Sequence, residues 1–296
     1  MISDMQREER PKPEKPKSVI SIMVIMKFSI CNELFEKWEF KEVLKFISTV
    51  GYDAIEIAPF TLCNSVFELG RGRRKELSEE LSSFGIECSA LHWLLVKPVG
   101  LHISHPDPSV RSKTIEYLRE LISFADDIGC RTLVFGSPRQ RDIQGMDKSQ
   151  GWKLAQETFG ACVRSLEDRD VTIGLEPLRH DTTNFINRAD EAAQFIEAIG
   201  SDHFRLTLDV FAMTGEEVSP ADTIRKHGRS LVHFHANDDN ERGPGTGGAD
   251  YKQIKMALED VGYMGYASIE VFKFDQDPRT VAQGALDFLR KLFAIQ

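Results

Sequence analysis

The stretch RSKTIEYLRELISFADDIGCRTLVFGSP, residues 111–138, contains the unit that decides the fold of this chain. Residues 111–128 place apolar side chains at helical spacing, Gly129 follows them, and residues 130–135 form a short run of apolar and β-branched side chains. A glycine just past a helix end is the usual left-handed cap, so this stretch predicts a helix that leads directly into a strand.

The same unit recurs along the chain. Further glycines precede short apolar or aromatic runs, at Gly51, Gly85, Gly200, Gly228 and Gly262, and the run VTIGLEPL follows Asp170. With KFSIC at the start of the pattern, eight strands are predicted, and helical stretches such as 152–168, 188–199 and 280–294 lie between them. Short buried strands that alternate with helices indicate a parallel sheet. Eight such units predict a closed (β/α)8 TIM barrel of the α/β class rather than an open sheet.

The N-terminal residues differ in composition from the rest. Residues 1–18 are charged and rich in proline, so we expect a disordered tail, with residues 19–296 forming a single barrel domain. The apolar run VISIMVIM at 19–26 is too short to cross a bilayer, and no basic segment with a cleavage site precedes it. We therefore predict no membrane partner and no signal peptide.

Charge and cysteine content narrow the class of protein further. The chain has 37 basic and 46 acidic residues, a net charge of −9, which opposes non-specific binding to nucleic acid. Its five cysteines are scattered without CxxC spacing. Such a set is typical of reduced packing residues in a cytoplasmic protein rather than of a disulfide framework.

Acidic and imidazole side chains mark the ends of the last four predicted strands. Glu176 ends GLEP, Asp209 ends LTLD, His233 and His235 lie in HFHAND, and Glu270 lies in SIEVF. In a TIM barrel the carboxyl ends of the strands form one rim, where the chemistry takes place. Small or polar residues two positions before each acid, such as Gly174, indicate faces turned into the barrel.

Four such groups would repel one another unless something neutralised them. Three carboxylates and one imidazole are an oxygen-rich set that suits Mn²⁺ first, with Mg²⁺ or Co²⁺ as alternatives, better than it suits a thiolate zinc site. The alternative is that individual acids pair with buried arginines.

The motifs resemble those of the xylose-isomerase-like TIM barrels, in the branch of sugar phosphate isomerases and epimerases that includes D-tagatose 3-epimerase and D-psicose 3-epimerase. LEPL with TNF, then LTLDVF, HFHAND with RGPGTG, and SIEVF come in the family's order. The resemblance runs from about Lys27 to the C-terminus.

The resemblance implies a metal held by Glu176, Asp209, His235 and Glu270, with His233 one layer deeper. It also implies that Glu176 and Glu270 are the two catalytic bases. One removes a proton beside the carbonyl of a small carbohydrate, and the other returns it to the opposite face of an enediolate. Dimers or tetramers are usual in this family, so we expect a homo-oligomer.

Two positions depart from the family pattern. The epimerases carry a histidine where this chain has Ala212, and an acid where it has Thr182. Both groups usually hold substrate hydroxyls, so their absence puts a free ketohexose in doubt as the substrate. Arg242 matches the family's arginine of the seventh loop, with a spacing from His235 that is one residue longer.

Further candidates for substrate binding lie elsewhere along the chain. His92 ends the third strand and is either a substrate contact or a packed core imidazole. Glu56, in YDAIEIAP, resembles Glu270 in YASIEVF, and is either a substrate or supporting carboxylate or a salt-bridge partner of a helix. His233 joins this group as a supporting imidazole.

Three enzymatic functions remain open at this point, and a metal-free binding barrel comes last because it explains none of the four strand-end groups. The first is a metal-dependent sugar isomerase or epimerase. The second is a lyase of the same superfamily, such as a keto-cyclitol dehydratase or a 3-keto-glycoside deglycosidase, which begins with the same proton abstraction. The third is a DNA-repair enzyme like endonuclease IV, against which Ala212 and the net charge of −9 argue.

Overall fold

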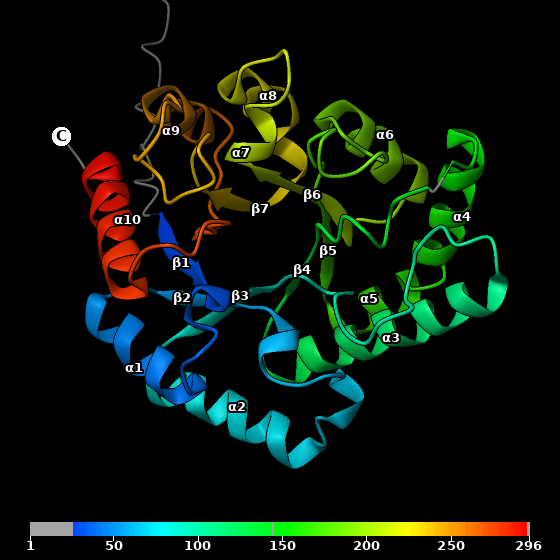
Figure 1. Cartoon of the computed structure of the whole chain (residues 1–296), viewed down its shortest axis with the longest axis horizontal. Coiled ribbons are helices and arrows are strands. Elements are labelled where there is room, and N and C mark those ends of the chain that lie inside the picture. The colour runs from blue at the N-terminus through cyan, green and yellow to red at the C-terminus, as the bar shows by residue number, and fades with distance from the viewer. Residues whose placement is uncertain (1–25, 144, 295–296) are drawn as a thin grey trace, which may run out of the picture.

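The strands of the molecule close into a single barrel. The computed structural model describes residues 26–143 and 145–294. Eight strands pair in parallel in chain order, and the first also pairs with the last, which confirms the predicted TIM barrel (Figure 1). They are β1 (Lys27–Cys31), β2 (Ala54–Ile57), β3 (Glu87–Leu91), β4 (Thr132–Phe135), β5 (Thr172–Leu175), β6 (Phe204–Asp209), β7 (Leu231–Ala236) and β8 (Tyr266–Ile269). The tail predicted at 1–18 lies outside the described residues.

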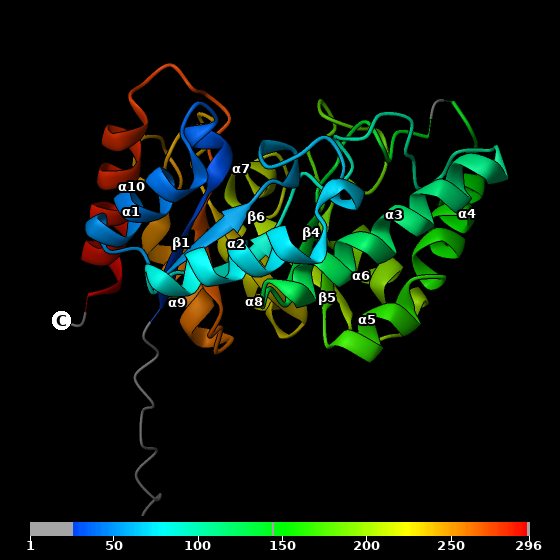
Figure 2. The same ribbon diagram turned by 90° about the horizontal axis from the view of Figure 1, so that it is seen from below.

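Helices surround the barrel on its outer side (Figure 2). They are α1 (Phe40–Val50), α2 (Arg71–Ser83), α3 (Pro108–Asp127), α4 (Lys148–Gly160), α5 (Val163–Arg169), α6 (Ala189–Ile199), α7 (Val210–Met213), α8 (Pro220–His227), α9 (Tyr251–Asp260) and α10 (Pro278–Phe293). Short 3-10 turns are η1 (Asn32–Phe35), η2 (Pro59–Thr61), η3 (Val66–Glu68) and η4 (Gly228–Ser230). Each longer helix buries one apolar face, as α1 does with Val43, Leu44 and Ile47, and so covers the sheet.

The glycines predicted as helix caps are confirmed at five of six junctions. Gly51, Gly85, Gly129, Gly200 and Gly262 have φ between 64° and 100°, the left-handed region that a glycine reaches without steric cost. The prediction is wrong at Gly228, whose φ is −57°. A side chain there would meet Val261, since an added Cβ would lie 2.6 Å from its atoms, so Gly228 permits close packing of α8 on the chain that leads into β8.

The helical stretch predicted at 152–168 is two helices. The first, α4, ends at Gly160 and the second, α5, begins at Val163. Glycine is a poor helix former, and the backbone N–H of Ala161 still bonds to Glu157 before the chain turns. The other predicted helices match α3, α6 and α10 within three residues at each end.

Small polar side chains fill the barrel interior beneath the rim. Ser29 and Ser89 meet across the interior with their Oγ atoms 2.6 Å apart, and Ser268 is fully buried. Gly174 faces Thr207 so closely that an added Cβ would lie 2.2 Å from the Thr207 Oγ1 atom. The strand faces predicted to turn inward therefore do so, and they leave space above for larger polar groups.

Two further sequence predictions concern cysteines and membranes. All five cysteines are free thiols, and four of them are buried. No helix in residues 26–143 or 145–294 is long and apolar enough to cross a membrane.

Candidate metal centre and active site

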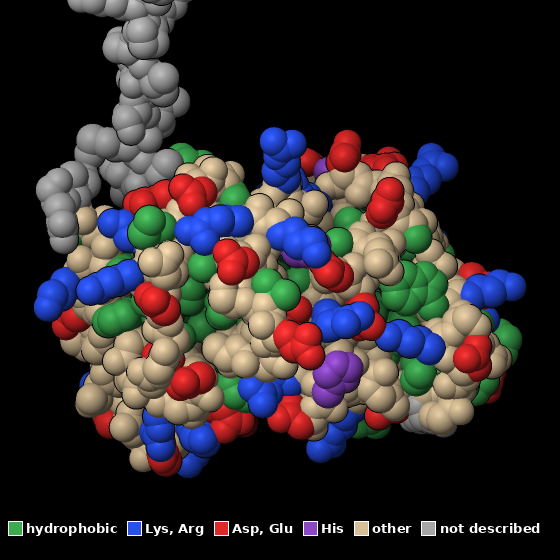
Figure 3. Space-filling view, turned by 90° about the horizontal axis from the view of Figure 1, so that it is seen from above, with side chains coloured by type: hydrophobic (Ala, Val, Ile, Leu, Met, Phe, Trp, Pro, Cys, Tyr) green, Lys and Arg blue, Asp and Glu red, His purple; other side chains and the backbone are tan. Residues whose placement is uncertain are grey.

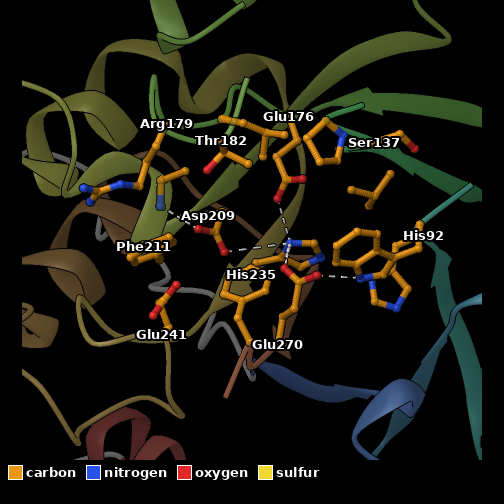
Figure 4. Close-up of a pocket in the computed structure, with 17 residues that line it drawn as sticks. His92, Ser137, Glu176, Arg179, Thr182, Asp209, Phe211, His235, Glu241 and Glu270 are labelled. Atoms are coloured by element: carbon orange, nitrogen blue, oxygen red, sulfur yellow. Dashed lines mark hydrogen bonds and ion pairs between the residues drawn. The ribbon is translucent and has the colours of Figure 1, made fainter. Parts of the chain in front are cut away.

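Four side chains meet at the carboxyl-terminal rim of β5–β8. Glu176, Asp209, His235 and Glu270 each offer one ligand atom, and these atoms all lie within 4.8 Å of one another. The Nδ1 atom of His235 is 2.9 Å from Glu176 Oε1 and 2.9 Å from Glu270 Oε2, and 4.0 Å from Asp209 Oδ2. The two glutamates approach the imidazole from opposite sides (Figure 4). All four residues are buried.

His235 is held from beneath by a further carboxylate, that of Glu56. Its Nε2 atom lies 3.0 Å from Glu56 Oε1, and the other oxygen of Glu56 lies 2.7 Å from His233 Nε2. Glu56 comes from β2, on the far side of the barrel from β7. A histidine that donates one ring N–H to a carboxylate presents its other nitrogen as a lone pair to a metal, which fixes both tautomer and orientation.

Asp209 and Glu176 are held by neighbouring backbone and side chains. Asp209 accepts hydrogen bonds from the Ala212 N–H at 2.6 Å and from the Asn237 amide at 2.5 Å. The buried guanidinium of Arg141 donates to the Glu176 carbonyl at 2.7 Å and to the Phe135 carbonyl at 2.6 Å. Arg141 therefore fixes the main chain that carries Glu176 without neutralising its carboxylate.

Gly136 makes room for the Glu176 carboxylate. A Cβ added at this position would lie 2.0 Å from Glu176 Oε2. Gly136 follows β4 directly, so only a residue without a side chain leaves the space that the carboxylate occupies.

The electrostatics of the centre are those of an incompletely neutralised acidic cluster. Burial raises the pKa of Asp209 well above its ordinary value, and the neighbouring Glu176 and Glu270 raise it further. Burial alone would lower the pKa of His235, but Glu270, Glu56 and Glu176 outweigh it and raise that pKa well above its usual range. The cluster therefore favours any positive charge that enters it.

The donor set fits a divalent cation. With its Nε2–H directed to Glu56, a neutral His235 would present the lone pair of Nδ1 to a cation beside the oxygens of Glu176 and Glu270, each 2.9 Å from that nitrogen. A cation can therefore replace the proton that the raised pKa of His235 favours on this nitrogen. Three carboxylates and an imidazole suit a hard or borderline divalent ion.

A cavity of about 190 Å³ opens above these four residues. Besides them it is lined by His92, which lies beside Glu270 with its Nδ1 3.4 Å from Glu270 Oε1. The two positions that depart from the epimerase pattern, Thr182 and Ala212, also line it. The structure thus brings together the four predicted metal ligands and the predicted substrate contact His92. Thr182 and Ala212, the two residues that differ from the epimerase pattern, lie in the same cavity.

Three predicted substrate contacts lie elsewhere. Glu56 and His233 are fully buried beneath His235 and are not among the residues that line the cavity, so they support the imidazole instead of facing a substrate. Arg242 does not line the cavity either, because both its terminal nitrogens bond to the Asp275 carboxylate at the surface.

Several cavity residues were not identified from the sequence. Arg179 and Phe211 lie on the Asp209 side, with the guanidinium 4.7 Å from the centre of the ring, and Glu241 lies near them (Figure 4). Glu241 has a left-handed φ of 67° and pairs with Lys273 at 2.8 Å. Arg179 directly follows the LEPL motif, and that adjacency was the one available signal; Glu241 lies in a loop whose path no motif predicts.

Comparison with known proteins agrees with this geometry. Residues 44–292 match the family described as "Xylose isomerase-like TIM barrel". A curated relative, D-psicose 3-epimerase of Enterocloster bolteae, is 26% identical over 302 residues, which cover 91% of this chain and 97% of that protein. L-ribulose 3-epimerase of Mesorhizobium japonicum is 28% identical over 172 residues, which cover 57% of this chain and 58% of that protein.

Solved structures share the fold. A D-psicose 3-epimerase crystallised with D-fructose superposes with a TM-score of 0.80 at 22% identity, covering 90% of this chain and 99% of that one. A 3-keto-D-glucoside 4-epimerase from E. coli superposes with a TM-score of 0.79 at 18% identity, covering 90% of this chain and all of the other. With its closed eight-stranded barrel and a family match over most of its length, the chain belongs to the xylose-isomerase-like TIM barrels.

Proposed function

We propose that this protein is a divalent-metal-dependent sugar epimerase or isomerase that removes and returns a proton beside the carbonyl of a keto-sugar. One observation carries the proposal. The carboxylates of Glu176 and Glu270 approach the same nitrogen of His235 from opposite sides, each at 2.9 Å, and both line the cavity above it. A substrate carbon held there has a base on each face.

The roles of the side chains follow from that placement. One glutamate removes the proton from the carbon next to the carbonyl, and the other delivers a proton to the opposite face of the resulting enediolate. Glu176, Asp209, His235 and Glu270 would hold a divalent ion, which would polarise the carbonyl and stabilise the developing negative charge. We propose that His92, which lies beside Glu270 and lines the cavity, holds a substrate hydroxyl.

The relatives support this chemistry. Curated proteins that match 80–91% of this chain include D-psicose 3-epimerases, and a further match over 90% of the chain is a 3-dehydro-D-guloside 4-epimerase of Escherichia coli. The activities for which these relatives are named share the inversion of one carbon of a sugar that carries a carbonyl group. They support the epimerase more strongly than the lyase.

Deuterated water tests the proposal. Turnover of a keto-sugar in this solvent should label the carbon next to the carbonyl, because an abstracted proton exchanges at a carboxylate. Glu176→Gln and Glu270→Gln should each lower turnover by more than the roughly 10²–10⁴-fold expected of one general base, because a metal ligand is weakened as well. Exchange without net turnover should survive in at most one of the two variants.

The contrary outcome is a product free of solvent deuterium. It would indicate direct transfer of hydrogen between two carbons, and the shared fold would then not extend to the mechanism. A lyase begins with the same abstraction, so mass analysis of the product separates it: elimination loses a leaving group, whereas epimerisation conserves the mass.

Manganese is the ion we propose, with magnesium and cobalt as alternatives, because three of the four ligands are carboxylates. We also propose a cytoplasmic homo-oligomer that acts on a small carbohydrate and binds neither nucleic acid nor membranes. The interspersed acidic and basic side chains of the face in Figure 3 agree with the absence of a nucleic-acid groove on that face.

A further inference from the structure

One positively charged side chain lines the cavity above the candidate metal centre. In the part of the chain that the structure describes, Arg179 is the only lysine or arginine among the residues that line this cavity. Its side chain is 28% exposed, and it lies on the side of the cavity where Asp209 stands (Figure 4). The removal and return of a proton by the two glutamates leaves this charge without a role.

The guanidinium of Arg179 is held at the cavity wall. It lies over the ring of Phe211, with its central carbon 4.7 Å from the ring centre. Phe211 is itself fixed, because its backbone N–H donates to Asn237 Oδ1 at 2.7 Å. Gly215 leaves room for the arginine, since a Cβ added there would lie 3.0 Å from the Arg179 Cγ atom. An arginine packed on a ring loses less conformational freedom on binding a ligand than a free surface arginine does.

The hydrogen bonds of Arg179 leave one of its terminal nitrogens free. Nε and Nη2 donate to the Asp181 carboxylate at 3.3–3.4 Å, whereas Nη1 has no hydrogen-bond partner within residues 26–143 and 145–294. Asp181 is 65% exposed, and an ion pair at the surface contributes little because water screens it. The guanidinium can therefore bind an anionic ligand without losing a strong ion pair.

The other charges of the cavity do not neutralise Arg179. The three carboxylates of the candidate metal centre would be bound to the metal ion. Glu241, the remaining acid that lines the cavity, pairs with Lys273 at 2.8 Å. Thr182 and Ala212, which line the same cavity, carry no charge. With a divalent ion bound, the guanidinium is thus a positive charge that the cavity leaves open to a ligand.

We propose that Arg179 binds an anionic group of the substrate, so that the enzyme acts on a keto-sugar that bears a carboxylate or a phosphate. A planar guanidinium matches either group through two parallel hydrogen bonds. The inference rests on the proposed function, because it takes this cavity as the substrate site. It places the reacting carbon between Glu176 and Glu270 and the anionic group on the side of Phe211.

Three sugars that share a ketone at carbon 2 test the inference. D-fructose is uncharged, 2-keto-D-gluconate carries a carboxylate, and D-fructose 6-phosphate carries a phosphate at the other end of the chain. In the manganese-loaded protein, we expect kcat/KM for at least one anionic sugar to exceed that for fructose by about 10–100-fold, the usual effect of a hydrogen bond to a charged group. The anionic sugar with the larger value shows whether the group is a carboxylate or a phosphate.

Arg179→Met assigns the preference to this residue. The variant keeps an apolar contact with Phe211 and removes the charge, so the ratio of kcat/KM between the anionic sugar and fructose should fall by about 10–100-fold. Arg179→Lys keeps a charge without the planar fork and should retain part of the ratio. Arg139→Met is the matched control, because Arg139 is an exposed arginine of the loop after β4 that does not line the cavity. Its ratio should equal that of the unaltered protein.

An unchanged ratio in Arg179→Met would overturn the inference, and so would equal kcat/KM for all three sugars in the unaltered protein. Thermal unfolding shows that each variant is folded.

Equilibrium binding separates this inference from the proposed function. Calorimetric titration of the manganese-loaded protein with the same sugars requires no turnover. A preference for an anionic sugar that Arg179→Met abolishes, without any solvent deuterium in the sugar, would support the role of Arg179 and contradict the proposed function. Deuterium in the product together with equal affinity for all three sugars would support the proposed function and overturn the role of Arg179.

Discussion

Single residues decide whether the rim can hold its ligands, and Gly136 is the clearest case. The space that its side chain would take is filled by the Glu176 carboxylate. Gly136→Ala should therefore displace Glu176, weaken metal binding by about 10–100-fold and lower turnover by about 100-fold, since a displacement of about 1 Å has effects of this size.

The matched control for this variant is Gly160→Ala. Nothing lies within 4 Å of a Cβ built at Gly160, so metal affinity and turnover should stay unchanged. Calorimetric titration with Mn²⁺ and steady-state kinetics measure the two effects. Equal metal affinity in Gly136→Ala and in the unaltered protein would show that the carboxylate has another position open to it.

Thr182 and Ala212 set the expected substrate preference. Both line the cavity, and the resemblance to the epimerases implies an acid and a histidine at these positions in that family. We predict poor turnover of fructose, psicose and tagatose relative to a modified or oxidised sugar, measured as kcat/KM for each. Fast epimerisation of unmodified psicose would contradict this and would assign hydroxyl binding to other cavity residues such as Arg179 and Glu241.

At the scale of elements, the loop between β7 and α9 is organised by one carboxylate. Asp238 is fully buried and accepts hydrogen bonds from the backbone N–H groups of Asp239, Gly245 and Ala249. The same loop brings Glu241 to the cavity.

Asp238→Ala should lower the free energy of unfolding by about 1–3 kcal/mol, because buried N–H groups lose their acceptor. Denaturant unfolding measures the loss, and limited proteolysis should show faster cleavage between residues 239 and 249. Asp238→Asn keeps one acceptor oxygen, so its free energy of unfolding should lie between those of Asp238→Ala and the unaltered chain. A variant as stable and as resistant as the unaltered chain would show that other contacts hold the loop.

The sequence predicted the elements better than the loops. The barrel and the acids at its rim follow from repeated local patterns, since helical spacing, glycine caps and strand-end acids are each visible within a few residues. The resemblance to the family, and not the local pattern, selected His235 over His233 as a candidate ligand. Glu33, Glu241 and Arg179 lie in loops or turns, where tertiary contacts decide the path. Arg242 shows the same limit: it follows His235 in the family's order with one extra residue between them, but its side chain pairs with Asp275.

At the scale of the whole molecule, the barrel axis concentrates acidic groups. Glu33, Glu56, Glu176, Asp209 and Glu270 are all buried there, and in the described residues their ion-pair partners are the imidazoles of His92, His233 and His235. A closed barrel brings these side chains into one column although they lie in, or just after, seven different strands. Cations should therefore stabilise the whole fold.

Mn²⁺ should raise the melting temperature of the metal-free protein. At 100 times its Kd a ligand contributes about 2.7 kcal/mol, and about 2–4 °C per kcal/mol is usual for chains approaching this size. The rise should shrink as pH is lowered, because the raised pKa of Asp209 lets protons compete with the metal. Calorimetry with and without chelator measures it, and an undiminished rise in His235→Ala would place the stabilising ion elsewhere.

The support of His235 from across the barrel has a consequence for half-barrels. All four ligands of the candidate metal centre come from β5–β8, yet Glu56, which orients His235, comes from β2, and His92, beside Glu270, follows β3. A fragment with the second half alone would contain every ligand and lack the groups that orient them. Chimeric barrels built from two relatives would therefore need halves matched in the pairs Glu56–His235 and His92–Glu270, and not only at the strands where they join.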